Sequence, residues 1–186
     1  MKIIISGLTA SGKSTLARGI SEELNLKYFS ASSKLREIMP PRDFEFWESQ
    51  KGLDVVKFRL KNLKYDRLLD DYILKYVKEH DNLVLDSWVA SWKINDEKTI
   101  KIYLKVDLET RAWRVSQRGN MGYGEALKFM KEKDRLSAKI YYTLYKIKIA
   151  EDMLPFDLVI NSAALSVESL KKVCLEYIVK RMKKWK

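Results

Sequence analysis

The sequence has little of the residue types on which several classes of protein depend. Cys174 is the only cysteine among 186 residues, so this chain can form neither a disulfide framework nor a cysteine-rich zinc site. His80 is the only histidine, and it ends an expected helix, where it is better suited to cap that helix than to serve in catalysis. No segment approaches the roughly 20 apolar residues of a membrane span, and no signal peptide is expected at Met1. We therefore expect a cytoplasmic protein that does not enter a membrane.

Glycine and proline are also scarce, at seven and three residues, and no Gly/Ser-rich or low-complexity stretch interrupts the chain. Apolar residues make up 46% of the sequence and charged residues 33%, which is typical of a globular domain and argues against disorder. We therefore predict a single domain over residues 1–186 and expect it to be a monomer.

Positive charge, in contrast, is in excess. Thirty-six lysines and arginines against 25 acidic residues leave a net charge of +11, which favours anionic partners of any size, including nucleic acid. Several of these cations lie within residues 180–186, where the end of a last helix would hold them in solvent and complement its dipole. The charge thus predicts the sign of a partner but not its size.

Short apolar runs alternate with segments of helical period, a pattern typical of a parallel sheet with helices on both faces. The five expected strands are Lys2–Ser6, Lys27–Ser30, Leu83–Asp86, Ile100–Val106 and Phe156–Asn161. The fourth strand alternates apolar and polar residues, which indicates that one of its faces is partly exposed. Amphipathic helices are expected over Lys13–Leu24 and Ser166–Lys184. The predicted fold class is α/β, with three α/β/α layers around a five-stranded parallel sheet.

Two long insertions interrupt this pattern. Residues 31–80 separate the second strand from the third and are broken by Pro40–Pro41. Residues 119–140 begin with a cluster of glycines, Gly119, Gly122 and Gly124, and continue into a basic helical stretch. Glycines beside a charged helix are expected hinges, so the second insertion is interpreted as a closing lid.

One segment indicates a mechanism. Residues 7–14, GLTASGKS, fit the P-loop pattern G-x-x-x-x-G-K-[ST], and they lie between an expected strand and an expected helix. In such a loop successive backbone N–H groups point at phosphate oxygens, Lys13 reaches the β and γ phosphates of ATP, and the Ser14 hydroxyl binds Mg²⁺. The residues expected to hold the nucleotide are Gly7, Ala10, Ser11, Gly12, Lys13, Ser14 and Thr15. The fold class is therefore refined to P-loop NTPase-like.

A carboxylate and several cations complete the expected site. Asp86 ends the third strand, which usually lies beside the first, and there it would hold Mg²⁺ together with Ser14. Phosphoryl transfer also needs positive charge around the transferring group. Besides Lys13, the candidates for catalysis are Arg36, Arg118, Lys131 and Arg135. For each of them, a solvated helix face is the alternative interpretation.

The succession of motifs resembles the nucleoside monophosphate kinases, and most closely the archaeal type of cytidylate kinase. Residues 28–36, YFSASSKLR, are similar to that family's strand followed by Ser-Ala-Gly-Asp-x-x-Arg, and residues 66–70, DRLLD, to its Asp-x-x-x-Asp helix. Residues 85–92, LDSWVASW, 111–114, RAWR, and 156–161, FDLVIN, are similar to further segments of the family. The likeness runs through nearly the whole chain.

The resemblance implies an enzyme that phosphorylates CMP, or dCMP, with ATP and Mg²⁺. By this likeness Ser30 and Arg36 hold the acceptor nucleotide, and Arg118 lies at the base of the lid. The likeness also places Asp66 and Asp70 on the acceptor-binding helix. A monophosphate is already ionised near neutral pH and needs no general base, which agrees with a sequence that offers none.

The sequence departs from the family at several positions. Ser32 replaces a glycine, and Trp88 stands where many members carry an arginine. Arginines of the family's lid fall approximately on Lys131, Lys133 and Ile140. Lysine keeps the charge but loses the fork that grips a phosphate with two hydrogen bonds.

Two other functions stay open. A P-loop kinase of another acceptor, such as another nucleotide or the 5′-hydroxyl end of an RNA, would need a base, and Asp66 or Asp70 could supply it. A nucleotide- or RNA-binding protein with reduced catalysis would fit the lysines that replace lid arginines. The favoured partner is a small CMP-like nucleotide, with nucleic acid as the less favoured one.

Overall fold

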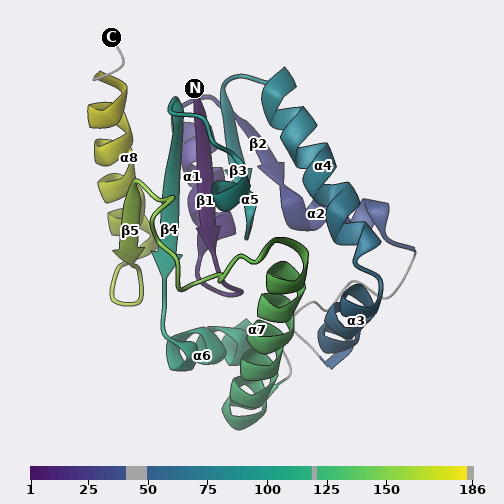
Figure 1. The fold of residues 1–186 in the computed structure, drawn as a ribbon. Coiled ribbons are helices and arrows are strands. Elements are labelled where there is room, and N and C mark those ends of the chain that lie inside the picture. The colour runs from purple at the N-terminus through teal and green to yellow at the C-terminus, as the bar shows by residue number, and fades with distance from the viewer. Residues whose placement is uncertain (41–49, 119–120, 184–186) are drawn as a thin grey trace.

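Five parallel strands form the centre of the computed structural model, which describes residues 1–40, 50–118 and 121–183 (Figure 1). The strands are β1 (Lys2–Gly7), β2 (Lys27–Ser30), β3 (Leu83–Asp86), β4 (Thr99–Lys105) and β5 (Leu158–Asn161). Their spatial order is β2-β3-β1-β4-β5, and every neighbouring pair is parallel. The structure therefore confirms the α/β class and the five-stranded parallel sheet.

Alternation of side chains along β1 divides the interior into two layers. Ile3 and Ile5 pack on the face covered by α1 (Lys13–Glu23) and α8 (Val167–Lys183), whereas Ile4 packs on the other face. That other face is covered by α2 (Ala31–Ile38), α4 (Lys64–Glu79) and α5 (Ala90–Lys93). Buried Cys174 lies on α8 in the first layer, as the sequence predicts.

A third group of helices lies beyond the carboxyl ends of the strands, where the arrowheads point in Figure 1. It consists of α3 (Gln50–Lys61), α6 (Leu108–Arg118) and α7 (Tyr123–Tyr145). Buried side chains of α7, among them Phe129, Met130 and Ile140, share one apolar cluster with α3 and α6. The long basic stretch that follows the glycine cluster is thus a helix with a substantial buried side.

The strand that was expected to have a partly exposed face is more covered than its pattern indicates. Lys101 is half-buried and Lys105 is exposed, but Tyr103 is only 3% exposed. The rings of Trp92 and Phe156 pack edge-on against Tyr103, with centroids 6.2 and 5.0 Å away. Burial accordingly raises the pKa of Tyr103 to about 12. Phe156 packs against Tyr103 from outside the sheet, since β5 begins at Leu158, two residues later than predicted.

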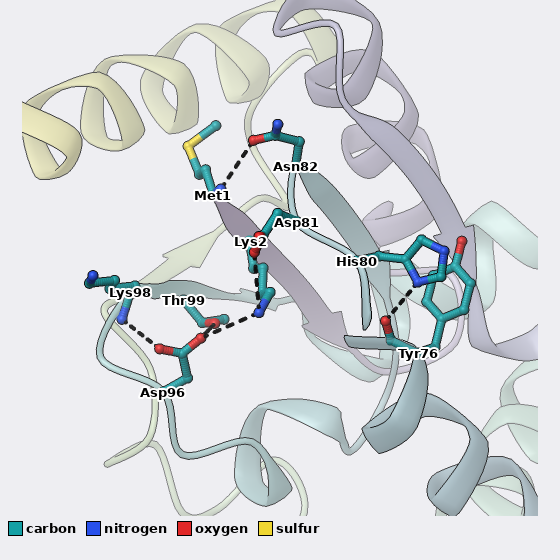
Figure 2. A network of polar contacts seen from close by, with 9 residues as sticks. All are labelled: Met1, Lys2, Tyr76, His80, Asp81, Asn82, Asp96, Lys98 and Thr99. Carbon is teal, nitrogen blue, oxygen red and sulfur yellow. Dashed lines mark hydrogen bonds and ion pairs between the residues drawn. The ribbon is translucent and has the colours of Figure 1, made fainter. Parts of the chain in front are cut away.

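The opposite end of the sheet, where the strands begin, is held by short polar contacts (Figure 2). The amino group of Met1 donates to Asn82 Oδ1 at 3.1 Å, and Lys2 Nζ lies 3.5 Å from a carboxylate oxygen of Asp81. His80 Nδ1 lies 3.0 Å from the Tyr76 carbonyl oxygen, at the C-cap of α4. This confirms the capping role expected for the single histidine.

Part of each predicted insertion falls outside the described residues, namely residues 41–49 of the first and residues 119–120, with Gly119, of the second. Lys184, the last residue of the helix expected over 166–184, falls outside them too. Within residues 1–40, 50–118 and 121–183, none of the helices combines the length and the apolar character needed to cross a membrane.

Candidate active site

The loop between β1 and α1 depends on its two glycines for its shape. Gly12 has a φ of +95°, a conformation that side chains with a Cβ rarely adopt. Gly7 is required by close approach, because a Cβ there would lie 2.6 Å from Ser11 Oγ and 2.9 Å from the Leu104 carbonyl oxygen. The glycines of the motif therefore occupy positions where a larger residue would distort the loop.

Ser14 and Asp86 meet at the carboxyl edge of the sheet. The register pairs Ile5 of β1 with Asp86 of β3, so β3 lies beside β1 as predicted. Ser14 Oγ, in the first turn of α1, donates to Asp86 Oδ2 at 2.5 Å. These are oxygen ligands of the kind that Mg²⁺ prefers. Within the described part of the chain no group of three or more His, Cys, Asp or Glu side chains could hold a metal ion, so an ion here would also need oxygen ligands from other sources.

A hollow opens beside this loop, and we call it the first hollow. Its walls come from the loop, from α2, α3 and α4, from the segment after β3, and from α6 and α7. The predicted site residues that line it are Ala10, Gly12, Lys13, Ser14, Thr15, Arg36, Asp70, Asp86 and Arg118. The fold thus brings nine of the predicted residues into one cavity.

Ser30 and Asp66 are not among the residues that line the first hollow. Ser30 is the N-cap of α2, where its Oγ accepts a hydrogen bond from the Ser33 N–H at 3.3 Å. Asp66 is 1% exposed, and its Oδ1 accepts from Arg59 Nη2 at 2.5 Å. Asp66 therefore reaches the hollow only through Arg59, which does line it.

Two predicted lid cations, Lys131 and Arg135, lie on the exposed side of α7 and do not line the first hollow. Arg135 forms an ion pair with Glu132 on the same helix at 2.7 Å. Lys133 lies between them in sequence, is 5% exposed, and lines the hollow. The helical period explains the difference, because residues two positions apart on an α-helix point in nearly opposite directions, whereas residues four apart, such as Lys131 and Arg135, share a face.

The wall of the first hollow that α3, α4 and α7 form contains a buried polar network. Arg59, which is 6% exposed, donates to Asp66 and also contacts the Tyr141 hydroxyl at 3.4 Å. Burial alone would lower the pKa of Arg59, but the charge of Asp66 outweighs this and raises it. Burial also raises the pKa of Tyr141, so this hydroxyl keeps its proton.

Asp70 lies next to this network and faces the first hollow. Lys93 Nζ donates to Asp70 Oδ2 at 3.2 Å, and the Tyr145 hydroxyl also hydrogen-bonds to this carboxylate. Burial raises the pKa of Asp70 above its ordinary value in spite of both contacts. The hollow thus holds a desolvated carboxylate beside a guanidinium and a phenol.

Sequence reasoning did not select Arg59, Ser137 or Tyr141 as site residues, and it named Lys133 only as one of several lid cations. All four line the first hollow. A signal existed for α7, because Lys133, Ser137 and Tyr141 recur at intervals of four on its buried side. No such signal exists for Arg59, because its position at the hollow depends on how α3 packs against its neighbours.

A second hollow lies on the other side of the loop. It is lined by Ser11, Gly12, Thr15, Leu16, Arg114, Arg118, Ser162, Leu165, Val167 and Leu170. Arg114 fixes its wall by donating to the carbonyl oxygens of Ala10 and Ser162, both at 3.2 Å. Gly12, Thr15 and Arg118 line both hollows, so the two cavities meet at the loop.

Residues 2–164 match the sequence pattern of the cytidylate kinase-like family. The chain belongs to this family. Two relatives, both named cytidylate kinase, support the assignment. The enzyme of Pyrobaculum islandicum is 34% identical over 176 residues, which cover 95% of this chain and 91% of the relative. That of Sulfurisphaera tokodaii is 30% identical over 178 residues, covering 96% and 95%. Membership makes the chain a nucleoside monophosphate kinase.

Solved structures show the same fold at lower identity. An uncharacterized protein of Eubacterium ventriosum has a TM-score of 0.70 and 21% identity, covering 96% of this chain and 98% of that one. Deoxyadenosine kinase from M. mycoides, with bound dATP, has a TM-score of 0.57 and 20% identity, covering 96% and 99%. The cytidylate kinase-like chain therefore shares its fold with these two proteins.

Proposed function

We propose that this chain transfers the terminal phosphoryl group of ATP to CMP, giving ADP and CDP. The observation that supports this most is the meeting of the two hollows at the loop, where Gly12, Thr15 and Arg118 line both. A donor whose phosphates lie on the loop extends its nucleoside into one hollow, and an acceptor phosphate approaches from the other. Such an arrangement places the reacting groups side by side, which is the main catalytic requirement of phosphoryl transfer.

The second hollow suits the nucleoside of ATP. Leu165, Val167 and Leu170 give it an apolar wall, and the guanidinium groups of Arg114 and Arg118 line it as well. A base needs such a flat apolar surface, and arginine stacks on aromatic planes.

Ser14 and Asp86 are the residues that would hold Mg²⁺, since their oxygens lie in contact at the end of the loop. The ion would neutralise charge on the donor phosphates. Around that point the first hollow is lined by five cationic side chains, Lys13, Arg36, Arg59, Arg118 and Lys133, against the two carboxylates Asp70 and Asp86. This excess of positive charge stabilises the negative charge that spreads over the transferring group.

The acceptor needs little more than orientation. A nucleoside monophosphate presents an ionised oxygen as nucleophile, so no side chain has to remove a proton. Arg36 lines the first hollow but not the second, which fits a role at the acceptor phosphate. Residues 31–80 and 119–140 supply most of this wall through α2, α3, α4 and α7, and we propose that they act as acceptor-binding region and lid.

The polar side chains of Arg59, Asp70 and Tyr141, which line the first hollow, are complementary to cytosine. The exocyclic amino group of cytosine is a donor, and Asp70 offers a carboxylate. The ring nitrogen and carbonyl oxygen of cytosine are acceptors, and Arg59 and Tyr141 offer donors. Uracil has a carbonyl where cytosine has its amino group, so Asp70 would disfavour UMP.

The test is a panel of acceptors. ADP formation from ATP and Mg²⁺ is measured with CMP, dCMP, UMP, AMP and a 5′-hydroxyl RNA oligonucleotide. We expect CMP to be the best substrate by kcat/KM, with dCMP next. Lack of any CMP-dependent turnover, or faster phosphorylation of the RNA end, would contradict the proposal.

A pair of matched variants tests whether Asp70 recognises the base of the acceptor. Asp70→Asn should lower the ratio of kcat/KM for CMP to that for UMP by roughly tenfold or more, because one charged hydrogen bond is lost. Asp71→Asn, a neighbouring exposed carboxylate, should leave the ratio unchanged. An unchanged ratio in Asp70→Asn would place the base elsewhere.

A further inference from the structure

Asp86 accepts a hydrogen bond from a second hydroxyl besides that of Ser14. The Tyr28 hydroxyl, from β2, donates to the same oxygen, Oδ2, at 3.3 Å. Ser14 approaches this carboxylate from α1, so donors from two different elements converge on it. Ser14 belongs to the phosphate-binding motif, whereas Tyr28 does not.

The sheet register explains why Tyr28 reaches Asp86. Tyr28 is paired with Val84, two residues before Asp86 on β3, so all three side chains lie on the same face of the sheet. A phenol is long enough to span the two residues towards the carboxyl edge. A slip of one residue in this register would turn the Tyr28 ring to the opposite face of the sheet, away from Asp86.

Tyr28 is itself held in place. The Arg18 guanidinium lies 5.0 Å from the centre of the Tyr28 ring, and Arg18 also hydrogen-bonds to the hydroxyl. Arg18 is four residues after Ser14, so both side chains lie on one face of α1.

We propose that Tyr28 is a positioning residue for Asp86. Its hydroxyl fixes the carboxylate in the orientation that faces Ser14, so the two oxygen ligands for Mg²⁺ are set before the nucleotide binds. This rests on the proposed roles of Ser14 and Asp86. Partners that orient a ligating carboxylate commonly change metal affinity by about 10–100-fold when they are removed. Because the contact measures 3.3 Å, we expect an effect near the lower end of that range.

The experiment measures nucleotide binding rather than turnover. The affinity of the protein for the non-hydrolysable analogue AMPPNP is determined by calorimetry with saturating Mg²⁺ and again with EDTA, and the ratio of the two is the magnesium enhancement. In Tyr28→Phe this enhancement should fall about tenfold, while the affinity in EDTA stays unchanged. Tyr72→Phe, the same change at a tyrosine 37% exposed on α4, should leave both values unchanged.

The proposal is overturned if Tyr28→Phe keeps the full magnesium enhancement, or if affinity falls equally with Mg²⁺ and with EDTA, since a purely structural role predicts the latter. The double variant Tyr28→Phe with Asp86→Asn should match Asp86→Asn alone, because the hydroxyl acts only through that carboxylate. Independent, additive losses would also overturn it. Wild-type protein that shows the enhancement but does not use CMP would contradict the proposed acceptor and leave the role of Tyr28 intact.

Discussion

The two ends of the sheet use charge in opposite ways. Where the strands begin, Lys2 lies within 4.0 Å of two carboxylates, Asp81 and Asp96, and the contacts join adjoining turns at the surface (Figure 2). Where the strands end, positive side chains from separate helices line one hollow and outnumber the carboxylates there. Parallel strands send all their carboxyl ends to one edge, which collects distant segments at that edge. At the beginning of the sheet opposite charges are therefore paired with each other, whereas the excess of positive charge at its end favours an anion.

The largest effect is expected from the buried ion pair at the carboxyl end. Asp66→Ala leaves the Arg59 guanidinium buried without its carboxylate, so the free energy of unfolding should fall by about 3–5 kcal/mol. Urea denaturation measures this. Lys2→Ala, which removes the cation of the exposed pairs, should cost about 1 kcal/mol or less. Equal losses in the two variants would remove the contrast between the ends.

The next effect concerns catalysis. Lys13→Ala should lower kcat about 10²–10³-fold, because a preorganised charge at the transferring group is lost. The steady-state rate of ADP formation measures it, with Lys2→Ala as the control that keeps wild-type kcat. A loss of less than tenfold in Lys13→Ala would show that the charge at the carboxyl end is not concentrated on the loop.

A smaller effect separates charge from geometry in the first hollow. Arg36→Lys keeps the positive charge but loses the planar fork that grips phosphate with two hydrogen bonds. The KM for the acceptor should rise by about tenfold, while the KM for ATP stays unchanged, because Arg36 does not line the second hollow. Lys34→Ala, which removes a cation of α2 that lines neither hollow, is the control. A change in the KM for ATP would contradict the assignment of the hollows.

The smallest effect is expected at Asp96, where the strands begin. Burial alone would raise its pKa, but hydrogen bonds from the Lys98 N–H and the Thr99 hydroxyl, with the charge of Lys2, lower it below the ordinary 3.8. A carboxyl with a lowered pKa stabilises the fold above 3.8 and loses that contribution as the pH falls through its folded pKa. Asp96→Asn should therefore cost about 1 kcal/mol or less at pH 7.

As the pH falls below 3.8 and then through the lower folded pKa of Asp96, the same variant should approach wild-type stability, since wild-type Asp96 becomes protonated in the folded protein too. Thermal unfolding of wild type and Asp96→Asn, at pH 7 and below the folded pKa of Asp96, measures the difference in stability. The kcat of the variant at pH 7 should equal that of wild type. A stability difference that stays constant with pH would show that charge does not stabilise this end.

Much of the site could be predicted from local sequence. The motif at residues 7–14 carries its own structural requirement, and the positive φ of Gly12 and the crowding at Gly7 are what such a loop needs. Asp86 could be found because it ends an apolar strand. Lys131 and Arg135 were favoured over Lys133 as the catalytic lid cations because charge alone does not show which side of a helix is buried. Arg59 could not be found, since its pairing with Asp66 depends on how two helices pack.

By itself the sequence determined the parallel sheet, the phosphate-binding loop and the membership in a kinase family, because apolar periodicity and a glycine-containing motif act over a few residues. Only the tertiary structure decided which cations line the first hollow, that Asp66 pairs with Arg59, and that Tyr28 reaches Asp86. Those outcomes depend on strand register and on the rotation of each helix about its axis. Both are set by packing across the whole core, not by neighbouring residues.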